Sequence, residues 1–273
     1  MRSGGSDHQV ALVTGGGSGI GAALAKLLAA RGVRVVVTDV DEGRATAIAE
    51  AVGGRAQLLD VTDAAAFEAV VDEIYETEGR LDYLFNNAGV GLAGLVVDLT
   101  TEDWRSVVEV NLWGVVNGIH AVYPRMVAAG RGAIVNTASG AGLCPRPGMT
   151  PYATTKHAVV GLTTSLRPEA ALHGVQVNTF CPGYIATDIV RATRFVGVDG
   201  EGMMEKVPIR PMTAERCAQI ALRGVDRNRA VIPVSFYVWL DWLIFRLSPR
   251  LSVWIAGFRA RQFAAHRKGA EAS

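Results

Sequence analysis

Cysteine is scarce in this sequence of 273 residues, and the three cysteines have no pairing pattern. They are Cys144, Cys181 and Cys217, an odd number without Cys-x-x-Cys spacing. This pattern argues against a disulfide framework or a zinc site, and it favours a reducing compartment. The histidines do not cluster with the cysteines at metal-ligand spacing either, so we expect no metal.

An excess of charge of either sign is also lacking. The 27 Lys and Arg residues nearly balance the 26 Asp and Glu residues, and the formal net charge is +1. Such a balance creates no overall field that would attract nucleic acid. Residues 1–9 are mostly polar and lack the apolar core of a signal peptide. We therefore interpret them as a flexible tail and expect a soluble, cytoplasmic protein.

The sequence does contain a regular alternation of short apolar runs with segments of helical periodicity. The predicted strands are 10–13, 33–38, 56–59, 81–85, 133–137, 175–180 and 230–234, and the predicted helices are 20–30, 43–52, 64–78, 104–129 and 152–172. Strands that are apolar on both faces and alternate with helices indicate a parallel sheet covered on both sides. We predict one α/β domain over 10–234, a doubly wound sheet of the Rossmann type, and a helical extension over 235–273. Pro168 predicts a kink or an earlier end in the last of these helices.

A glycine-rich segment at residues 14–21, TGGGSGIG, follows the first predicted strand and opens the first predicted helix. Glycines allow backbone to approach a pyrophosphate, and the N-terminus of the helix offers free N–H groups to phosphates. A simple tight turn is the alternative, but the strand–turn–helix context favours a nucleotide site. The expected cofactor-binding residues here are Gly15, Ser18, Gly19, Ile20 and Gly21.

Asp39 lies at the end of the second predicted strand, about twenty residues beyond the glycine loop. A carboxylate there can accept hydrogen bonds from the adenosine ribose and would repel a 2′-phosphate. This favours NAD over NADP. A helix cap or a solvated acid is the alternative, and Asp41 competes for either role.

Tyr152 and Lys156 are one helical turn apart at the start of a predicted helix, so they share a face. A cation near the phenol stabilises the phenolate and lowers the tyrosine pKa, which proton transfer requires. The same spacing also occurs in ordinary surface helices. Ser139 follows a predicted strand, at the edge of the sheet where open α/β folds bind ligands.

Together these motifs resemble the short, single-domain branch of the short-chain dehydrogenase/reductase family over about 10–234. The matching positions are 14–21, Asp60-Val61, Asn86-Asn87-Ala88-Gly89, Asn111, Ser139, Tyr152, Lys156, Pro182-Gly183 and Thr187. The interval from Ser139 to Tyr152 also agrees with that family.

The resemblance implies four catalytic roles. Tyr152 exchanges a proton with the substrate oxygen, and Ser139 orients that oxygen by a hydrogen bond. Lys156 holds the nicotinamide ribose and lowers the pKa of Tyr152. Asn111 anchors a water that links Lys156 to solvent. Read alone, Asn111 is more typical of a hydrogen-bonded core amide, and only the whole set of motifs favours the catalytic role.

The resemblance also implies further cofactor contacts. Asp60 and Val61 line the adenine, and Asn87 lies near the adenosine-side ribose. Ile185 and Thr187 bind the nicotinamide carboxamide. Asn87 is alternatively a turn residue.

Substrate specificity is expected from segments 91–95, 143–150 and 186–213. The last contains an apolar set suited to a mobile lid, although each residue singly suits core packing. The set is Phe195, Met203, Met204, Val207 and Ile209. We expect a lipophilic secondary alcohol or ketone as substrate.

The helical extension is rich in aromatic and cationic residues. Its apolar run is shorter than the roughly 20 residues that a spanning helix needs, and Asp241 interrupts it. Leu251, Trp254, Ile255 and Phe258 share one helical face. A subunit interface, a cap over the substrate entrance, and peripheral membrane contact all fit this pattern, and we expect a homo-oligomer.

The sequence therefore predicts an NAD-dependent oxidoreductase that transfers hydride between nicotinamide and an alcohol or ketone. One alternative is an NAD-binding sensor without catalytic activity. Another is an epimerase or dehydratase of the family's longer branch, which differs in glycine spacing and carries a larger C-terminal substrate domain.

Overall fold

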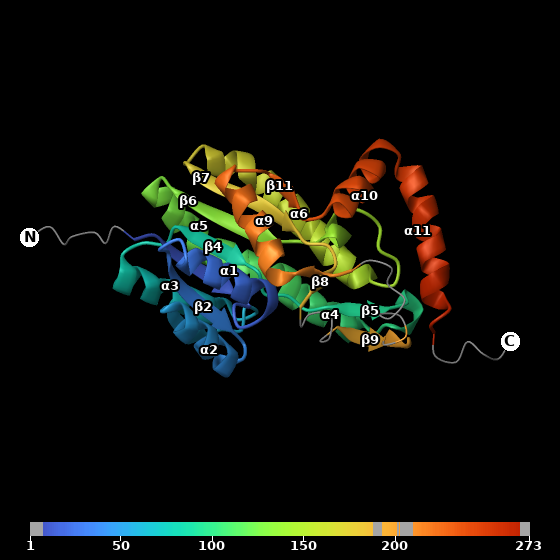
Figure 1. Ribbon diagram of the computed structural model, residues 1–273, viewed down its shortest axis with the longest axis horizontal. Helices are drawn as coiled ribbons and strands as arrows, with labels where there is room; N and C mark the ends of the chain where they lie inside the picture. Colours follow the sequence, from blue (N-terminus) through green and yellow to red (C-terminus); the bar gives the residue numbers. More distant parts are fainter. Residues whose placement is uncertain (1–7, 188–192, 201, 203–209, 268–273) are drawn as a thin grey trace, which may run out of the picture.

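The computed structural model describes residues 8–187, 193–200, 202 and 210–267. Seven parallel strands form the central sheet in the order β11-β7-β6-β4-β1-β2-β3 (Figure 1). They are β1 (Val10–Thr14), β2 (Arg34–Asp39), β3 (Arg55–Leu58), β4 (Tyr83–Asn86), β6 (Gly132–Thr137), β7 (Val175–Cys181) and β11 (Val231–Pro233). The predicted doubly wound sheet of the Rossmann type is confirmed.

Helices cover both faces of the sheet. The main helices are α1 (Gly19–Ala29), α2 (Glu42–Val52), α3 (Ala64–Glu78), α4 (Thr101–Val108), α5 (Gly114–Ala129), α6 (Thr150–Ala171) and α9 (Ala214–Asp226). In β1, Ala11 and Val13 face the core under α1, α2 and α9, whereas Val10 and Leu12 face α3, α5 and α6. Because successive side chains of a strand point to opposite faces, one apolar strand fills two cores.

Three features of the helices differ from the prediction. The expected helix at 104–129 is divided by a π-helical turn, η2 (Glu109–Trp113), which contains Asn111. The helix through Pro168 does not end early, because α6 continues to Ala171. Pro168 lies in the last turn, where its missing N–H removes only one hydrogen bond near the end. Helix α9 was not predicted, although Cys217, Ala218, Ala221, Leu222 and Val225 repeat at helical spacing.

Two pairs of short strands lie outside the central sheet. β5 (Leu92–Gly94) pairs with β9 (Arg194–Val196), and β8 (Ile185–Ala186) pairs with β10 (Met212–Thr213). Two further helices, α10 (Phe236–Leu247) and α11 (Pro249–Ala264), stand beside the sheet rather than on it (Figure 1). No helix in the described ranges has both the length and the apolarity to cross a bilayer.

Candidate active site

The glycine loop joins β1 to α1 at the point where the strand order reverses, because β2 and β4 lie on opposite sides of β1. Gly15 and Gly19 have φ angles of +59° and +51°, which favour glycine. A Cβ at Gly21 would overlap the carbonyl of Gly15. Ser18 precedes α1 without a side-chain cap bond, so the first N–H groups of α1 are available to a phosphate.

Asn87, the residue after β4, holds this loop in place by hydrogen bonds. Its Nδ2 donates to the carbonyl oxygens of Thr14 at 3.1 Å and Gly15 at 3.2 Å. The Thr14 hydroxyl accepts from the backbone N–H groups of Asn87 and Ala88 at 3.0 and 3.1 Å. The Asn87 side chain thus fixes the shape of the glycine loop. This is a larger structural role than that of a simple turn residue.

The carboxylate of Asp39 points back to the glycine loop. Its Oδ2 accepts from the Gly17 N–H at 3.0 Å, and its Oδ1 accepts from the Asp41 N–H at 3.1 Å. Asp41 is the N-cap of α2 and accepts from the Arg44 N–H at 3.0 Å. The structure therefore separates two acids that the sequence left in competition: Asp39 faces the loop, and Asp41 caps the next helix.

The remaining expected cofactor residues surround the same edge of the sheet. Asp60 is exposed, and its Oδ1 accepts a hydrogen bond from the Thr62 N–H. Val61 is buried and packs against Gly114. Ile185 is buried in β8, and the buried hydroxyl of Thr187 has no partner among the described residues. Together with the open glycine cradle, this orphaned hydroxyl fits a nicotinamide dinucleotide, whose carboxamide would supply the missing partner.

Ser139 and Tyr152 meet at the ends of β6 and β7. Ser139 caps the short turn η3 (Gly140–Gly142), where its Oγ accepts from the Ala141 N–H at 3.1 Å. Tyr152, in the first turn of α6, is half-buried and forms a hydrogen bond with the Ser139 side chain. A Cβ at Gly142 would overlap the Lys156 backbone, so glycine permits the close approach of η3 to α6.

Lys156 lies behind the phenol and is 2% exposed. Its Nζ donates to the Thr137 carbonyl at 2.9 Å and lies 5.7 Å from the centre of the Tyr152 ring. The Asn111 amide donates to the Val90 carbonyl at 2.9 Å and accepts from the Val90 N–H at 2.8 Å. Its side chain is therefore a hydrogen-bonded core amide, as the alternative interpretation held.

Burial dominates the protonation of this cluster. Desolvation raises the pKa of the Tyr152 phenol, partly offset by the hydrogen bond with Ser139. Desolvation also lowers the pKa of Lys156 to about 8 and raises that of the neighbouring Cys181 thiol to about 12. Burial thus shifts the Tyr152 pKa upward, opposite to the lowering expected from Lys156, whose ammonium is directed at the Thr137 carbonyl.

The low pKa of Lys156 predicts a pH dependence of stability. Between pH 8 and 10.5 the unfolded chain holds a proton on Lys156 that the folded chain has released, so the free energy of unfolding rises with pH. Relative to Lys156→Met, the wild-type protein without cofactor should gain ~3 kcal/mol across this window. Denaturant unfolding of both proteins at pH 7, 8.5 and 10 measures the difference, and parallel pH curves would contradict it.

Two neighbours of the cluster of Ser139, Tyr152 and Lys156 were not predicted from the sequence. Thr137 supplies the carbonyl that holds Lys156, and Cys181 places a neutral thiol close to Lys156 and Tyr152. Their positions at the ends of β6 and β7 carried a signal, because the ends of parallel strands gather at one edge. Their roles depend on pairing between strands, which the sequence does not display.

The structure brings together the three segments expected to set specificity. β5 pairs with β9, and Gly94 bridges to Met149, just ahead of α6. Ala93, Val198 and Phe263 of α11 form a buried apolar cluster with Leu95, Met149 and Phe195 packed against it. Of the expected lid residues, Met203, Met204, Val207 and Ile209 lie outside the described residues.

The C-terminal helices complete this side of the site. On α10, Tyr237 lies against Gly183, which follows β7, and Val238 lies against Gly140, which follows β6. Asp241 pairs with Arg146 at 3.0 Å and with Arg259 of α11 at 3.2 Å. The inner side of α10 is therefore fixed to the segments that follow β6 and β7, and Arg259 joins α11 to it.

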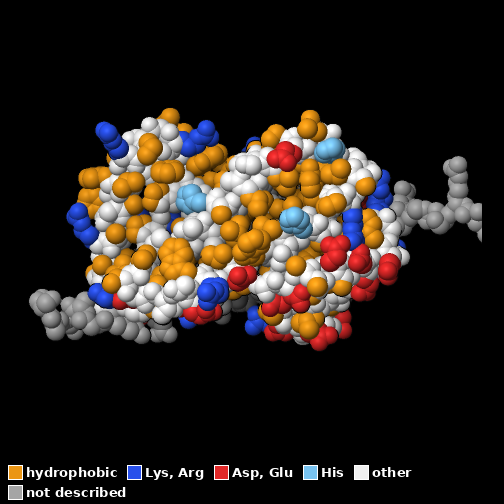
Figure 2. Space-filling model, turned by 180° about the vertical axis from the view of Figure 1, so that it is seen from behind, with side chains coloured by type: hydrophobic (Ala, Val, Ile, Leu, Met, Phe, Trp, Pro, Cys, Tyr) orange, Lys and Arg blue, Asp and Glu red, His pale blue; other side chains and the backbone are white. Residues whose placement is uncertain are grey.

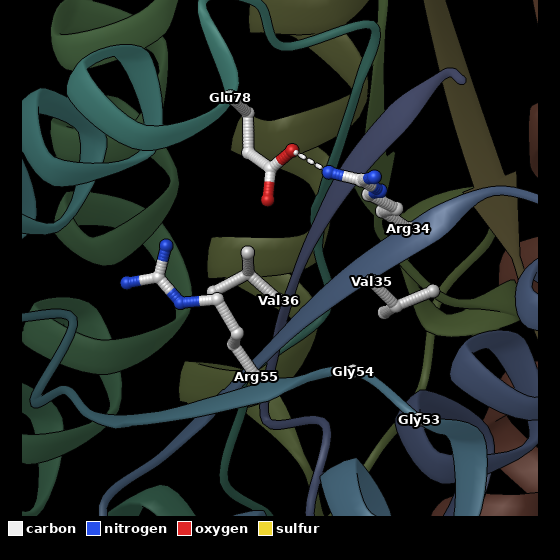
Figure 3. A pocket seen from close by; sticks show the side chains of 7 residues that line it. All are labelled: Arg34, Val35, Val36, Gly53, Gly54, Arg55 and Glu78. Atoms are coloured by element: carbon white, nitrogen blue, oxygen red, sulfur yellow. Dashed lines mark hydrogen bonds and ion pairs between the residues drawn. The ribbon is translucent and has the colours of Figure 1, made fainter. Parts of the chain in front are cut away.

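A hollow of about 230 Å³ lies away from this cluster (Figure 3). It is lined at the amino ends of β2 and β3, opposite the edge that carries the glycine loop. Its charged groups are paired, Arg34 with Glu78 at 2.7 Å and Arg55 with Glu73. The hollow is consequently not a candidate for the substrate site.

The comparisons with known proteins agree with this geometry. A family described as short chain dehydrogenase matches residues 9–195. The chain is 39% identical over 188 residues to the 3-oxoacyl-acyl-carrier-protein reductase FabG of Vibrio harveyi, covering 68% of this chain and 77% of that protein. It is 40% identical over 190 residues to a cyclohexanol dehydrogenase of Acinetobacter, covering 67% and 76%.

One longer relative also matches the C-terminal part of the chain. The probable oxidoreductase EphD of Mycobacterium tuberculosis is 35% identical over 253 residues, which cover 87% of this chain and 43% of that protein. The present chain thus spans less than half the length of that relative.

Two solved structures share the fold over nearly the whole chain. A short-chain dehydrogenase/reductase from Burkholderia phymatum in complex with NAD has a TM-score of 0.82 at 29% identity, covering 91% of this chain and 96% of that one. A short-chain dehydrogenase from Sphingobium yanoikuyae in complex with NADPH has a TM-score of 0.74 at 30% identity, covering 97% and 98%. The chain belongs to the short-chain dehydrogenase/reductase family. It is an oxidoreductase of this nicotinamide-dependent family.

Proposed function

We propose that the protein transfers hydride between NAD and a lipophilic secondary alcohol or ketone, with Tyr152 as acid and base. The observation that carries this proposal is the convergence of Ser139, Tyr152 and Lys156 at the carboxyl edge of β6 and β7. This edge is next to the glycine cradle at the topological switch point, where ligands of open α/β sheets bind. The bound nicotinamide supplies the hydride chemistry, and the protein supplies position and proton transfer.

Each side chain of the cluster has a separate task in this proposal. The Ser139 hydroxyl hydrogen-bonds the substrate oxygen and fixes it beside the phenol. The Tyr152 hydroxyl gives its proton to that oxygen during reduction and takes it back during oxidation. Lys156 holds the nicotinamide ribose through its ammonium, which requires the group to turn from the Thr137 carbonyl.

A proton path from Lys156 toward Asn111 is part of the proposal. A Cβ at Gly89 would lie 3.0 Å from Asn111 Oδ1 and 3.5 Å from Lys156 Nζ, so glycine keeps the space between them open. The Asn111 side-chain amide is already bonded to the Val90 backbone. In this proposal Asn111 therefore shapes the path, and a water molecule between Asn111 and Lys156 carries the proton.

The preference for NAD rests on the Asp39 carboxylate, which is held by the Gly17 N–H at 3.0 Å. A negative charge at the rim of the glycine loop suits two ribose hydroxyls and repels a 2′-phosphate.

The apolar cluster around Phe263, which we call the apolar wall, supports a lipophilic substrate. Leu95, Met149 and Phe195 come from the three segments that meet beside α6, and Phe263 closes the cluster from α11. Relatives named for a cyclic alcohol and for a 3-oxoacyl group are consistent with a carbonyl or alcohol on a largely hydrocarbon body. No comparison favours the alternative of a sensor without catalytic activity.

Replacing Phe195 tests this wall. Phe195→Ala should lower kcat/KM for bulky cyclic alcohols by about tenfold or more, since it removes a large apolar contact. For alcohols of three or four carbons, kcat/KM should change little. Initial rates over a size series measure this, with Phe236→Ala on the far face of α10 as the matched control. An equal loss for all sizes would contradict a specificity role.

The proposal as a whole is tested by NAD and NADP reduction with secondary alcohols from small polyols to sterol-sized rings. Turnover that prefers NAD and bulky apolar alcohols supports it. Preference for polar polyols would overturn the substrate class, and preference for NADP would overturn the cofactor.

A further inference from the structure

The outward surface of the two C-terminal helices is unusually apolar. Of the fifteen large hydrophobic side chains that are exposed in the described part of the chain, eight belong to α10 and α11. We call seven of these eight the outer face: Phe236, Trp239, Leu240, Leu247, Leu251, Trp254 and Phe258. The eighth, Val253, is exposed on another side of α11.

The outer face follows from the helical period. In α10, Phe236, Trp239, Leu240 and Leu247 share one side, whereas Val238 and Asp241 point to the opposite side. In α11, Leu251, Trp254 and Phe258 are exposed, while Ser252, Ala256 and Phe263 are buried. The inner sides are fixed to the substrate region by the apolar clusters and by the pairs of Asp241. Because the inner sides of α10 and α11 are held in place, the outer face points to solvent in a fixed orientation.

Cationic groups border the outer face. Arg246, Arg250 and Arg261 are exposed and form no ion pair with any described residue. The guanidinium of Arg261 lies 5.4 Å from the Phe258 ring, and Trp254 meets Phe258 edge-on at 4.6 Å. Asp241 is the one acid between positions 236 and 267, and it is directed inward toward Arg146 and Arg259. Figure 2 shows hydrophobic side chains over the lobe at the left, with Lys and Arg at its rim.

We propose that the outer face of α10 and α11 seats the protein on the surface of an anionic lipid bilayer. Tryptophan and phenylalanine insert at the boundary between headgroups and acyl chains, while arginines bind lipid phosphates. The helices have 12 and 16 residues, shorter than the roughly 20 that span a bilayer, so they lie in the membrane plane.

Charge distinguishes this occupant from a second copy of the chain. In a two-fold dimer the same surface meets itself. Arg246, Arg250 and Arg261 would then lie against the outer face of the second copy, whose described residues offer them no acid. In an anionic bilayer the lipid phosphates supply the missing negative charge, and the acyl-chain region accommodates the aromatic rings. The proposal does not depend on the cofactor or the substrate of the enzyme.

Sedimentation with vesicles tests the proposal on the full chain. We expect binding to phosphatidylcholine vesicles that contain 30% phosphatidylglycerol, weaker binding to pure phosphatidylcholine, and loss of the difference in 0.5 M NaCl. The triple variant Arg246→Gln/Arg250→Gln/Arg261→Gln should bind anionic vesicles about 100-fold more weakly, since each arginine contributes roughly fivefold. The emission of the exposed tryptophans should shift to the blue on binding.

A second pair of variants separates the outer face from general hydrophobicity. Trp239→Ser/Trp254→Ser/Phe258→Ser should lower the partition coefficient by more than about 100-fold. The matched control Val97→Ser/Trp113→Ser/Leu172→Ser removes exposed hydrophobic side chains elsewhere and should bind as wild type. Far-ultraviolet circular dichroism checks that each variant is folded. The proposal is overturned by equal loss of binding in the outer-face variant and in the control variant, by no binding of the wild type, or by a dimer that the outer-face variant abolishes without any vesicle binding.

Discussion

Replacing Tyr152 with phenylalanine is expected to lower kcat by about 10² to 10⁴-fold while cofactor affinity stays close to that of the wild type. The substitution removes only the hydroxyl, so the aromatic ring still fills its place in the first turn of α6. Ser139 can still hydrogen-bond the substrate oxygen, but no group remains to give or take the proton. Stopped-flow or steady-state absorbance of reduced nicotinamide measures kcat, and quenching of tryptophan fluorescence measures cofactor binding.

The matched control is Tyr83→Phe. Tyr83 begins β4 at the opposite edge of the sheet, where its hydroxyl donates to Gln9 Oε1 at 3.5 Å and to no other described residue. This variant should keep wild-type kcat and cofactor affinity. If Tyr152→Phe turned over near the wild-type rate, Tyr152 could not be the acid and base, and the proposed mechanism would fail.

Much of the fold could be predicted because the decisive signals are local. Most strands of the sheet contain a short apolar run, and the glycines of the loop between β1 and α1 indicate positions where the backbone needs glycine, such as Gly15 and Gly19. The π-helical turn at Asn111 carries no such signal, because the sequence through 104–129 keeps ordinary helical periodicity. Pro168 suggested a helix end that does not occur. The energetic cost of a proline in a helix depends on its distance from the helix end, and Pro168 lies in the last turn of α6.

The candidate site likewise contains features that local sequence predicts and features that depend on tertiary contacts. The positions of Ser139, Tyr152 and Lys156 could be predicted, because strand ends and one helical turn fix them. The direction of the Tyr152 pKa could not, because it depends on tertiary burial and on Lys156 being held by Thr137. The pairing of Asp241 with Arg146 likewise joins residues 95 positions apart, which no local pattern reveals.

Exchanging Asp39 for asparagine is expected to shift the preference between NAD and NADP by about 100-fold toward NADP. Asparagine keeps an oxygen that can accept from the Gly17 N–H, so the loop should hold its shape. The change removes one negative charge, and with it the repulsion of a 2′-phosphate and part of the bond to the ribose. Hydrogen bonds to charged groups are stronger by about 1 kcal/mol than neutral ones, and relief of repulsion adds to this.

The ratio of kcat/KM for the two cofactors measures the shift, and Asp41→Asn is its matched control. Asparagine is as good an N-cap as aspartate, so α2 should keep its cap on the Arg44 N–H and the ratio should not move. If the ratio moved for Asp41→Asn and not for Asp39→Asn, the acid that selects the cofactor would be the one at the helix cap. Because the two carboxylates differ in which N–H groups they hold, this pair of variants isolates charge at the glycine loop from charge two residues away.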